Sequence, residues 1–478
     1  VGFGYLILNR QSNSLSGGES QRINLATSIG SSLVGSMYIL DEPSIGLHPK
    51  DTDRLIRVLK SLRDVGNTVI VVEHEEDIMK AADEILDIGP KAGVYGGEIV
   101  FQGTHQALVS AKNSLTADYL TGKNEIPIPA KRRKSKNKLS IQGARQHNLK
   151  NIDVNFPLHS IVCVTGVSGS GKSTLVREIL LPAMLKKLGI YGNKQGDFKE
   201  IGGDIALVKA IEFVDQNPIG KSSRSNPVTY VKAYDEIRQL FADTQTAKIR
   251  GYKPSHFSFN VAGGRCDNCE GEGQVTIGMQ FMADLKLRCD VCKGKRFQDE
   301  VLDVRWHEKN IADILDMTVA DAILFFGTEE EGKRMPAGQK RLIQKLTPLL
   351  DVGLGYVTLG QSSNTLSGGE AQRIKLATFL SRGDRQAHTL FVFDEPTTGL
   401  HAHDVQKLLV SLNALLDQGH TVVVIEHHLD VIAHSNYIID LGPEGGDRGG
   451  QLVFQGTPRE LLKINESLTA RHLAQKIK

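Results

Sequence analysis

Tryptophan, cysteine and long apolar runs are scarce in this chain. Its 478 residues include one Trp and five Cys. So few cysteines exclude a small secreted scaffold held by disulfides, and no apolar run reaches the roughly 18 residues of a membrane-spanning helix. Apolar residues still make up 40% of the chain, which excludes wholesale disorder. The net charge of +2 alone gives no sign of a polyanionic partner.

A long internal repeat organises the sequence. Residues 13–23 recur almost unchanged at 364–374, and three further motifs recur at an offset of about 353 residues. The two copies cover residues 1–122 and 352–475, whereas residues 140–350 have no counterpart in the first copy. Two full repeats need about 700 residues. We therefore expect a further segment before Val1 to complete the first copy.

Short β-branched runs alternate with helical patterns. The runs 161–165, 390–393 and 421–425, with their counterparts in the first copy, predict buried parallel strands. Helical patterns follow at 173–181 and 404–416. This alternation is typical of an α/β fold with a parallel sheet.

Residues 166–173 read Gly-Val-Ser-Gly-Ser-Gly-Lys-Ser between a predicted strand and a predicted helix. This is the phosphate-binding pattern in its confirming context. The glycines let backbone N–H groups face phosphates at a helix N-terminus, Lys172 reaches the β- and γ-phosphates, and Ser173 binds magnesium. The predicted nucleotide contacts are Gly166, Ser168, Gly169, Ser170, Gly171, Lys172, Ser173 and Thr174.

Two predicted strands end in polar residues. Asp394 suits a magnesium ligand, and the adjacent Glu395 suits the polarisation of an attacking water. The alternative for this pair is an acidic cap on a turn. A histidine such as His427 is more often a packed core residue, but its recurrence in the same frame as His74 favours a role in the site.

The sequence Leu-Ser-Gly-Gly-Glu-x-Gln-Arg occurs at 15–22 and again at 366–373. With the Val-Asp-Gln-Asn-Pro segment at 214–218 and Pro-Thr-Thr-Gly-Leu at 396–400, the chain resembles the ABC-type ATPases. That resemblance implies two ATPase units stacked head to tail, so that the signature of one closes over the nucleotide of the other. No aromatic residue lies between 139 and 155, so the adenine contact is left to His147 or Arg145.

The head-to-tail arrangement implies two composite sites. In the first, Glu395, His427 and Gln216 have catalytic roles. The same site draws its nucleotide contacts from the phosphate loop, Asp394 and the first signature, at Ser16, Gly17 and Gly18. The second site is incomplete because its phosphate loop lies outside the sequence, and it comprises Asp41, Glu42, His74, Ser367, Gly368 and Gly369.

Two C-x-x-C pairs, Cys266 with Cys269 and Cys289 with Cys292, are separated by 19 residues. This spacing predicts a structural zinc site with four thiolates; a redox or disulfide pair is the alternative. The pattern also resembles the zinc repeats of DnaJ-type chaperones, but those proteins lack ATPase motifs. Cys163, in the middle of a predicted strand, is expected to be inert packing.

An ABC-type ATPase with this zinc insertion in tandem copies resembles the UvrA family, the damage-recognition subunits of the bacterial excinuclease. The resemblance covers nearly the whole chain and includes Arg-Ser-Asn-Pro at 224–227 and Gly-Gly-Arg-Cys at 263–266. It implies an ATPase that is not itself a nuclease, with ATP, magnesium and zinc as cofactors. It further implies a cytoplasmic homodimer without a membrane partner, which binds distorted duplex DNA and loads UvrB. A UvrA-like paralogue in drug self-resistance and a transporter ATPase are the alternatives.

Basic charge is segregated along the chain. Residues 221–296 hold 13 basic and 8 acidic side chains, and residues 123–138 hold seven basic and one acidic. Such segregation favours a phosphate-binding surface, although a solvated face is the alternative for any single residue. The predicted DNA contacts are Arg224, Lys248, Arg250, Lys253 and Arg265.

The sequence therefore predicts an α/β ABC-type ATPase with a parallel-sheet core, tandem units and an inserted four-cysteine module. The expected divisions are the end of a first ATPase unit at 1–122, a basic linker at 123–138, the start of a second ATPase unit at 139–220, an inserted region at 221–350 with the zinc module at 266–292, and the end of the second ATPase unit at 351–478.

Overall fold

The computed structural model describes residues 34–477 except 191, 193, 221, 223, 280–283, 329–334 and 382–386, together with residues 9, 23 and 25–27. The chain divides into two compact units, and each is described by itself. Unit 1 comprises Val1–Asp215 and Asp384–Lys478, and unit 2 comprises Gln216–Gly383. None of the described helices is long and apolar enough to cross a membrane.

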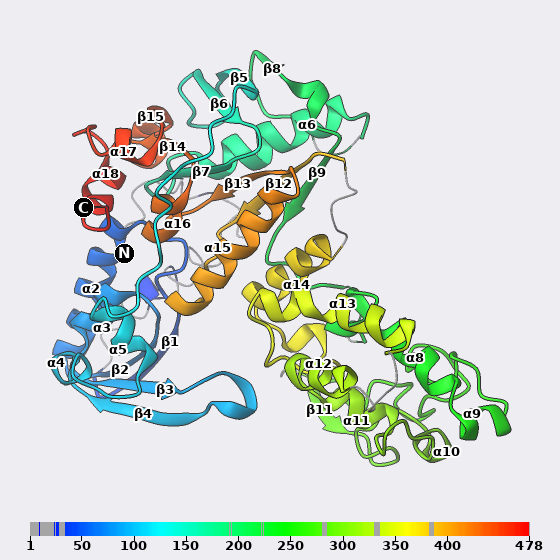
Figure 1. Cartoon of the computed structure of the whole chain (residues 1–478). Helices are drawn as coiled ribbons and strands as arrows, with labels where there is room; N and C mark the ends of the chain where they lie inside the picture. Colours follow the sequence, from blue (N-terminus) through cyan, green and yellow to red (C-terminus); the bar gives the residue numbers. More distant parts are fainter. Residues whose placement is uncertain are drawn as a thin grey trace. The chain divides into compact units, whose positions relative to one another are not determined.

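A six-stranded sheet forms the centre of unit 1 (Figure 1). Its neighbouring strands are parallel except for the edge pair of β14 and β15, which is antiparallel. The strands, in spatial order, are β15 (Gln451–Gly456), β14 (Tyr437–Gly442), β7 (Ile161–Gly166), β13 (Thr421–Ile425), β12 (Thr389–Asp394) and β9 (Ala210–Val214). The predicted strands at 161–165, 390–393 and 421–425 are confirmed as buried parallel neighbours.

Helices cover both faces of this sheet, which is why successive positions in the middle of its central strands are apolar on both sides. On one face, Val162 and Val164 of β7 pack with Leu175 and Ile179 of the helix that follows the phosphate loop. On the other face, Cys163 packs with α16 and α18, as expected for an inert core cysteine. The helical elements around the sheet are η3 (Thr174–Leu180), α6 (Leu181–Lys187), α15 (Ala402–Asp417), α16 (Leu429–His434), η6 (Gly446–Arg448), α17 (Pro458–Leu461) and α18 (Leu468–Leu473).

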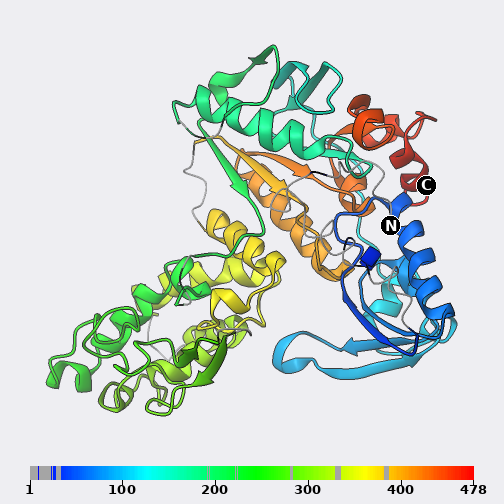
Figure 2. The same ribbon diagram turned by 180° about the vertical axis from the view of Figure 1, so that it is seen from behind.

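Unit 1 also contains a smaller antiparallel sheet, two of whose strands come before β7 in the sequence and one after it. It has the order β6–β5–β8, with β5 at Lys138–Ala144, β6 at Ile152–Pro157 and β8 at Glu200–Gly203. The short turn η4 (Ile205–Leu207) then leads into β9. Figure 2 shows this part of unit 1 from behind.

The first copy of the repeat forms the same succession of strands and helices as the second, but its described strands pair into two separate two-stranded sheets. Parallel strands β1 (Met37–Asp41) and β2 (Thr68–Val72) pack one face on α2 (Pro49–Asp64) and α3 (Glu76–Ala81). The rest of the copy consists of β3 (Ile85–Gly89), η2 (Gly93–Tyr95), β4 (Glu98–Gly103), α4 (His105–Leu108) and α5 (Leu115–Leu120).

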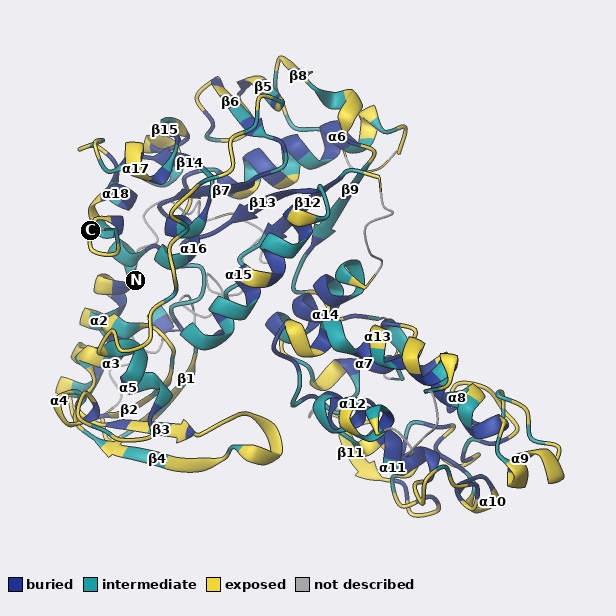
Figure 3. Cartoon of the chain, in the orientation of Figure 1, coloured by how far each residue is buried: buried dark blue, intermediate teal, exposed yellow. Residues whose placement is uncertain are grey.

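The prediction that the strands of the first copy are buried on both faces was wrong. Met37, Ile39 and Ile70 are 64%, 68% and 43% exposed, because in the described part of the chain helices cover only the opposite face of β1 and β2. Figure 3 shows the contrast between the dark blue central strands and the yellow surfaces of β3 and β4.

Unit 2 is mainly helical and carries the cysteine module. Its core includes the buried rings of Phe241, Phe257, Phe259 and Phe297. The elements are α7 (Pro227–Tyr230), α8 (Tyr234–Ala242), α9 (Gln245–Ile249), β10 (Gln274–Ile277), β11 (Leu285–Arg288), α10 (Asp299–Leu302), α11 (Ile311–Asp316), α12 (Val319–Gly327), α13 (Ala337–Asp351), η5 (Ser363–Thr365) and α14 (Gly368–Leu380).

Candidate nucleotide site

The phosphate loop joins the end of β7 to the helix that begins after Gly171. Gly166, Gly169 and Gly171 have φ angles of +128°, +75° and +101°. A Cβ on Gly166 would lie 1.9 Å from the Leu441 carbonyl oxygen, and one on Gly171 would lie 2.8 Å from a methyl group of Leu149. The turn therefore requires glycine at both positions.

Lys172 lies inside this turn and is 6% exposed. Its Nζ donates to the carbonyl oxygens of Gly166 at 3.0 Å and of Val167 at 2.8 Å. Burial lowers the pKa of Lys172 to about 8. The Ser170 hydroxyl is also buried and has no hydrogen-bond partner among the described residues. A bound phosphate would supply an acceptor for such a hydroxyl and for the lysine.

The predicted carboxylates and histidine meet at the same edge of the sheet. Asp394 ends β12, and His427 lies two residues beyond β13, the strand between β12 and β7. The His427 Nε2 is 3.8 Å from the Glu395 Oε1. Burial, reinforced by Asp394 and Glu426, raises the pKa of Glu395 to about 7. Burial also raises the pKa of Asp394, whose carboxylate forms an ion pair with Arg177.

Glu426 holds the two loops of this edge together. It is 2% exposed, and its Oε1 accepts hydrogen bonds from the Thr397 backbone N–H at 3.0 Å and from the Thr397 hydroxyl. Its Oε2 accepts the backbone N–H groups of His427 at 2.6 Å and His428 at 2.9 Å. One carboxylate thus fixes both the turn after Glu395 and the turn that carries His427.

The first copy of the repeat contributes a loop, residues 43–48, to this site. The Gly46 carbonyl oxygen accepts a hydrogen bond from the Ser168 hydroxyl at 3.4 Å. A Cβ on Gly46 would lie 3.0 Å from a carboxylate oxygen of Glu395, so the loop passes directly over that side chain. The predicted contacts Ser16, Gly17 and Gly18 lie outside the described residues.

Asp41, Glu42 and His74, the first-copy residues of the second composite site, are arranged in the same way as their counterparts in the second copy. The His74 Nε2 is 3.8 Å from the Glu42 Oε1, which equals the His427–Glu395 distance. A Cβ on Gly399 would lie 2.8 Å from Glu42, as Gly46 lies against Glu395. Asp41 ends β1 just as Asp394 ends β12. The two copies therefore approach each other reciprocally within unit 1.

Gln216 and the second signature belong to unit 2. Gln216 is its first residue and lies against Gly368, where a Cβ would be 3.1 Å from the Gln216 Cβ. Ser367 caps α14 in a capping box, accepting the Glu370 N–H at 3.2 Å while Glu370 accepts the Ser367 N–H at 2.8 Å. Gly368 and Gly369 form the first turn of that helix, so the signature presents a capped helix N-terminus.

Sequence reasoning missed three residues of the nucleotide site. Arg177, Glu426 and Asp440 carry no recognised motif, and each acts on a partner distant in the sequence. The repeat could have identified two of them, because Glu426 and Asp440 of the second copy match Glu73 and Asp87 of the first at the same offset as His427 and His74.

The four predicted zinc ligands converge in unit 2. The sulfur atoms of Cys266, Cys269, Cys289 and Cys292 lie within 4.8 Å of one another, and all four side chains are buried. The Cys266–Cys289 and Cys269–Cys292 sulfur distances are 4.0 and 3.6 Å. Tetrahedral zinc with Zn–S bonds of about 2.3 Å sets its sulfurs about 3.8 Å apart. The geometry therefore fits zinc, and it contains no disulfide.

The predicted DNA-contacting residues occupy two places in unit 2. Arg224 and Arg265 meet at Glu270, with nitrogen–oxygen distances of 3.0 and 3.7 Å. Arg250, at the end of α9, pairs with Asp303 at 3.2 Å, and Lys248 and Lys253 are exposed nearby in the sequence. The three arginines therefore have structural partners as well as a predicted role in DNA binding.

No family model matches the chain. The UvrABC system protein A of Clostridium perfringens is 54% identical over 474 residues, which are 99% of this chain and 49% of that protein. That of Thermus thermophilus is 55% identical over 476 residues, with the same shares of the two chains. The crystal structure of UvrA2 from Deinococcus radiodurans is 45% identical, covers 100% of this chain and 56% of its own, and superposes with a TM-score of 0.92.

The chain spans about half the length of the relatives that it matches. Over that half, the identity and the superposition both extend through the six-stranded sheet, the phosphate loop and the cysteine module. The chain has an α/β ABC-type ATPase fold with an inserted four-cysteine module, and it belongs to the family of UvrABC system protein A.

Proposed function

We propose that this chain binds and hydrolyses ATP at the site around Lys172. The observation that carries the proposal is the convergence, at one edge of a parallel sheet, of a phosphate loop, a buried lysine, and the side chains of Asp394, Glu395 and His427. The β- and γ-phosphates would replace the backbone carbonyls as partners of Lys172. The Ser170 hydroxyl offers a further donor.

Ser173 and Asp394 supply the hard oxygen ligands that suit magnesium. When bound, magnesium neutralises charge on the β- and γ-phosphates. Glu395, with a pKa near 7, is suited to orient the attacking water and accept its proton. His427 lies within reach of Glu395. The resemblance to ABC-type ATPases adds Gln216 and the first signature, Ser16–Gly18, as further proposed participants in ATP hydrolysis.

We also propose that the cysteine module holds a structural zinc ion. All four positions of a tetrahedral site are filled by protein thiolates, so no position is left open for substrate. The ion would fix unit 2 around its buried aromatic core.

The UvrA relatives support a wider role for the intact protein. It would dimerise, bind distorted duplex DNA in the cytoplasm, and load UvrB, with ATP hydrolysis controlling these steps. The predicted DNA contacts in unit 2 are arginines and lysines, whose binding to phosphates is independent of base sequence. Recognition of DNA shape rather than sequence suits a sensor of diverse damage.

Three measurements test this function in the full-length protein. Lys172→Ala should abolish ATP turnover, whereas Lys187→Ala, which removes an exposed lysine at the end of α6, should retain it. Unchanged turnover in Lys172→Ala contradicts the site assignment. DNA affinity should fall steeply as salt rises, and UvrB should be recruited to damaged duplex. A protein that hydrolyses ATP and binds DNA without recruiting UvrB would instead be a self-resistance paralogue.

A further inference from the structure

His48 occupies an unusual place at the end of the loop 43–48. It is 1% exposed and stands as the N-cap of α2, where its Nδ1 accepts the Lys50 N–H at 3.3 Å. Burial, with the nearby charge of Lys172, lowers the pKa of His48 to about 3, so the ring is neutral. Since Nδ1 accepts, Nε2 carries the proton. This Nε2 lies 3.4 Å from the Thr469 hydroxyl, which receives the hydrogen bond.

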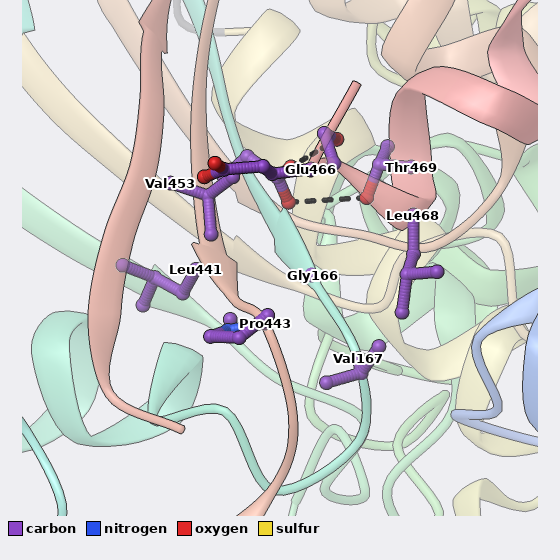
Figure 4. Close-up of a pocket in the computed structure, with 11 residues that line it drawn as sticks. Gly166, Val167, Leu441, Pro443, Val453, Glu466, Leu468 and Thr469 are labelled. Atoms are coloured by element: carbon purple, nitrogen blue, oxygen red, sulfur yellow. Dashed lines mark hydrogen bonds between the residues drawn. The ribbon is translucent and has the colours of Figure 1, made fainter. Parts of the chain in front are cut away.

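The chain of hydrogen bonds continues from Thr469 to Asp440 in β14, the strand that pairs with β7 beside the start of the phosphate loop. The Thr469 hydroxyl donates to Asp440 at 3.0 Å, and the Ser467 hydroxyl donates to the other carboxylate oxygen at 2.5 Å; both bonds are dashed in Figure 4. Asp440 lies in β14 opposite Thr165, the residue before Gly166. The side chains of these residues, namely His48, Thr165, Asp440, Ser467 and Thr469, are at most 2% exposed, so the connection is shielded from water.

An equivalent set of hydrogen bonds joins the two copies with their roles exchanged: the histidine comes from the second copy and the aspartate from the first. His401 caps α15 through the His403 N–H at 3.3 Å, and its Nε2 lies 3.4 Å from the Thr116 hydroxyl. Thr116 donates to Asp87 at 3.0 Å, and Ser114 donates to Asp87 at 2.6 Å. The four distances match those around His48 to within 0.1 Å. Each copy of the repeat thus supplies a histidine to one connection and an aspartate to the other.

We propose that His48 is a positioning residue of the ATP site, and that the His48–Thr469–Asp440 hydrogen bonds fasten the loop 43–48 of the first copy to β14, the strand paired with the end of β7 where the phosphate loop begins. The His401–Thr116–Asp87 hydrogen bonds form the reciprocal fastening. This inference rests on the proposed ATPase function. Its consequence is that the loop holds Gly46 against Glu395 and Ser168 only while the histidine is in place.

A neutral histidine meets two demands that an acidic residue cannot meet together. An aspartate at position 48 could accept the Lys50 N–H and cap α2. Being an acceptor only, it could not donate to Thr469, and it would place a second negative charge close to the buried Asp440. Histidine accepts through one ring nitrogen and donates through the other.

The test compares ATP turnover in the full-length protein and its variants. His48→Asn keeps a capping acceptor but loses the donor that reaches Thr469, and Thr469→Val removes the hydroxyl. Each should lower kcat about tenfold with KM changed less than about twofold, because misplacement of groups around the reacting atoms costs rate more than binding. The double variant should be no slower than the slower single variant. Thr469→Ser, which restores the hydroxyl, should recover most of the rate.

A matched control uses the same substitution at a neighbouring histidine. The His472 ring lies 5.6 Å from the His48 ring and takes no part in the hydrogen-bond chain, so His472→Asn should leave kcat unchanged. An equal loss in His472→Asn would show that packing alone is at work and would overturn the inference. Multiplying losses in the double variant, or equal rates for Thr469→Val and Thr469→Ser, would overturn it as well.

The outcomes separate this inference from the proposed function. Turnover that does not depend on Lys172 refutes the ATP site itself. Turnover that depends on Lys172 but is unchanged in His48→Asn refutes only the positioning role. Should His48→Asn fail to fold, as judged by its melting curve, the contrast between Thr469→Val and Thr469→Ser still decides the question.

Discussion

Replacement of Glu426 by glutamine tests how the two loops of the nucleotide site are held. The side chain keeps its shape, but one carboxylate oxygen becomes an NH2 group. Each oxygen of Glu426 accepts hydrogen bonds from two donors. In either orientation of the glutamine amide, its NH2 group therefore faces two donors and can accept from neither, so two hydrogen bonds are lost. A hydrogen bond to a charged group contributes about 1.5–3 kcal/mol, and the substitution should therefore cost about 3–6 kcal/mol.

This loss should be visible in both stability and turnover. For a domain of this size, the cost corresponds to a Tm lower by at least about 5 °C in a thermal melt. Because the bonds to the His427 and Thr397 backbones position His427 and the turn after Glu395, kcat for ATP should fall by about 10²-fold. Both quantities are measured on the same preparation, with ATP turnover determined well below the melting temperature.

The first copy provides the matched control. Glu73 occupies the equivalent position, is half-buried, and accepts one N–H at each oxygen, from Ser44 at 2.8 Å and His74 at 3.1 Å. Glu73→Gln loses one bond rather than two and should cost about half as much, about 1.5–3 kcal/mol. A Tm and kcat for Glu426→Gln equal to those of the parent protein, or losses in Glu73→Gln as large as those in Glu426→Gln, would refute the reasoning.

Three further predictions concern the same sites. Glu395→Gln should lower kcat by about 10²–10⁴-fold while ATP still binds, since it removes the proposed base and leaves the phosphate loop intact; loss of ATP binding in a titration would contradict this. Gly166→Ala should abolish nucleotide binding, because its Cβ would meet the Leu441 carbonyl oxygen at 1.9 Å, and normal binding would contradict the described turn. Cys289→Ser should reduce the zinc content measured by atomic absorption and lower the Tm of the protein, whereas a full zinc content would show that Cys289 is not a ligand.

Much of the fold could be predicted from the sequence because its signals are local. The run 161–165 is apolar at its first four positions, which indicates a strand covered on both faces, and the glycine spacing after it indicates a phosphate loop. The two C-x-x-C pairs carry their own ligand spacing. The repeat placed His427 and His74 in corresponding frames, and the structure gives both the same distance to a glutamate.

The errors and omissions have a different origin. Burial of β1 and β2 depends on which elements pack over them, and an apolar strand sequence cannot specify this. The role of His48 depends on Thr469, which is 421 residues away. A pattern within the loop 43–48 identifies a turn, but it cannot reveal which distant hydroxyl the imidazole will reach.

The segment that joins the two copies has a consequence for how strongly they need to bind. Arg132 donates to the Ala433 carbonyl oxygen at 2.7 Å and to that of Ser435, and Arg133 pairs with Asp417, so the linker is attached to the second copy. Only residues 121–131 remain between this attachment and α5, a length whose flexible span is about 17–20 Å. A tether of that length holds its ends at a mutual effective concentration in the millimolar range. Contacts worth only about 4 kcal/mol, the equivalent of a few buried hydrogen bonds, are then sufficient to hold the copies together.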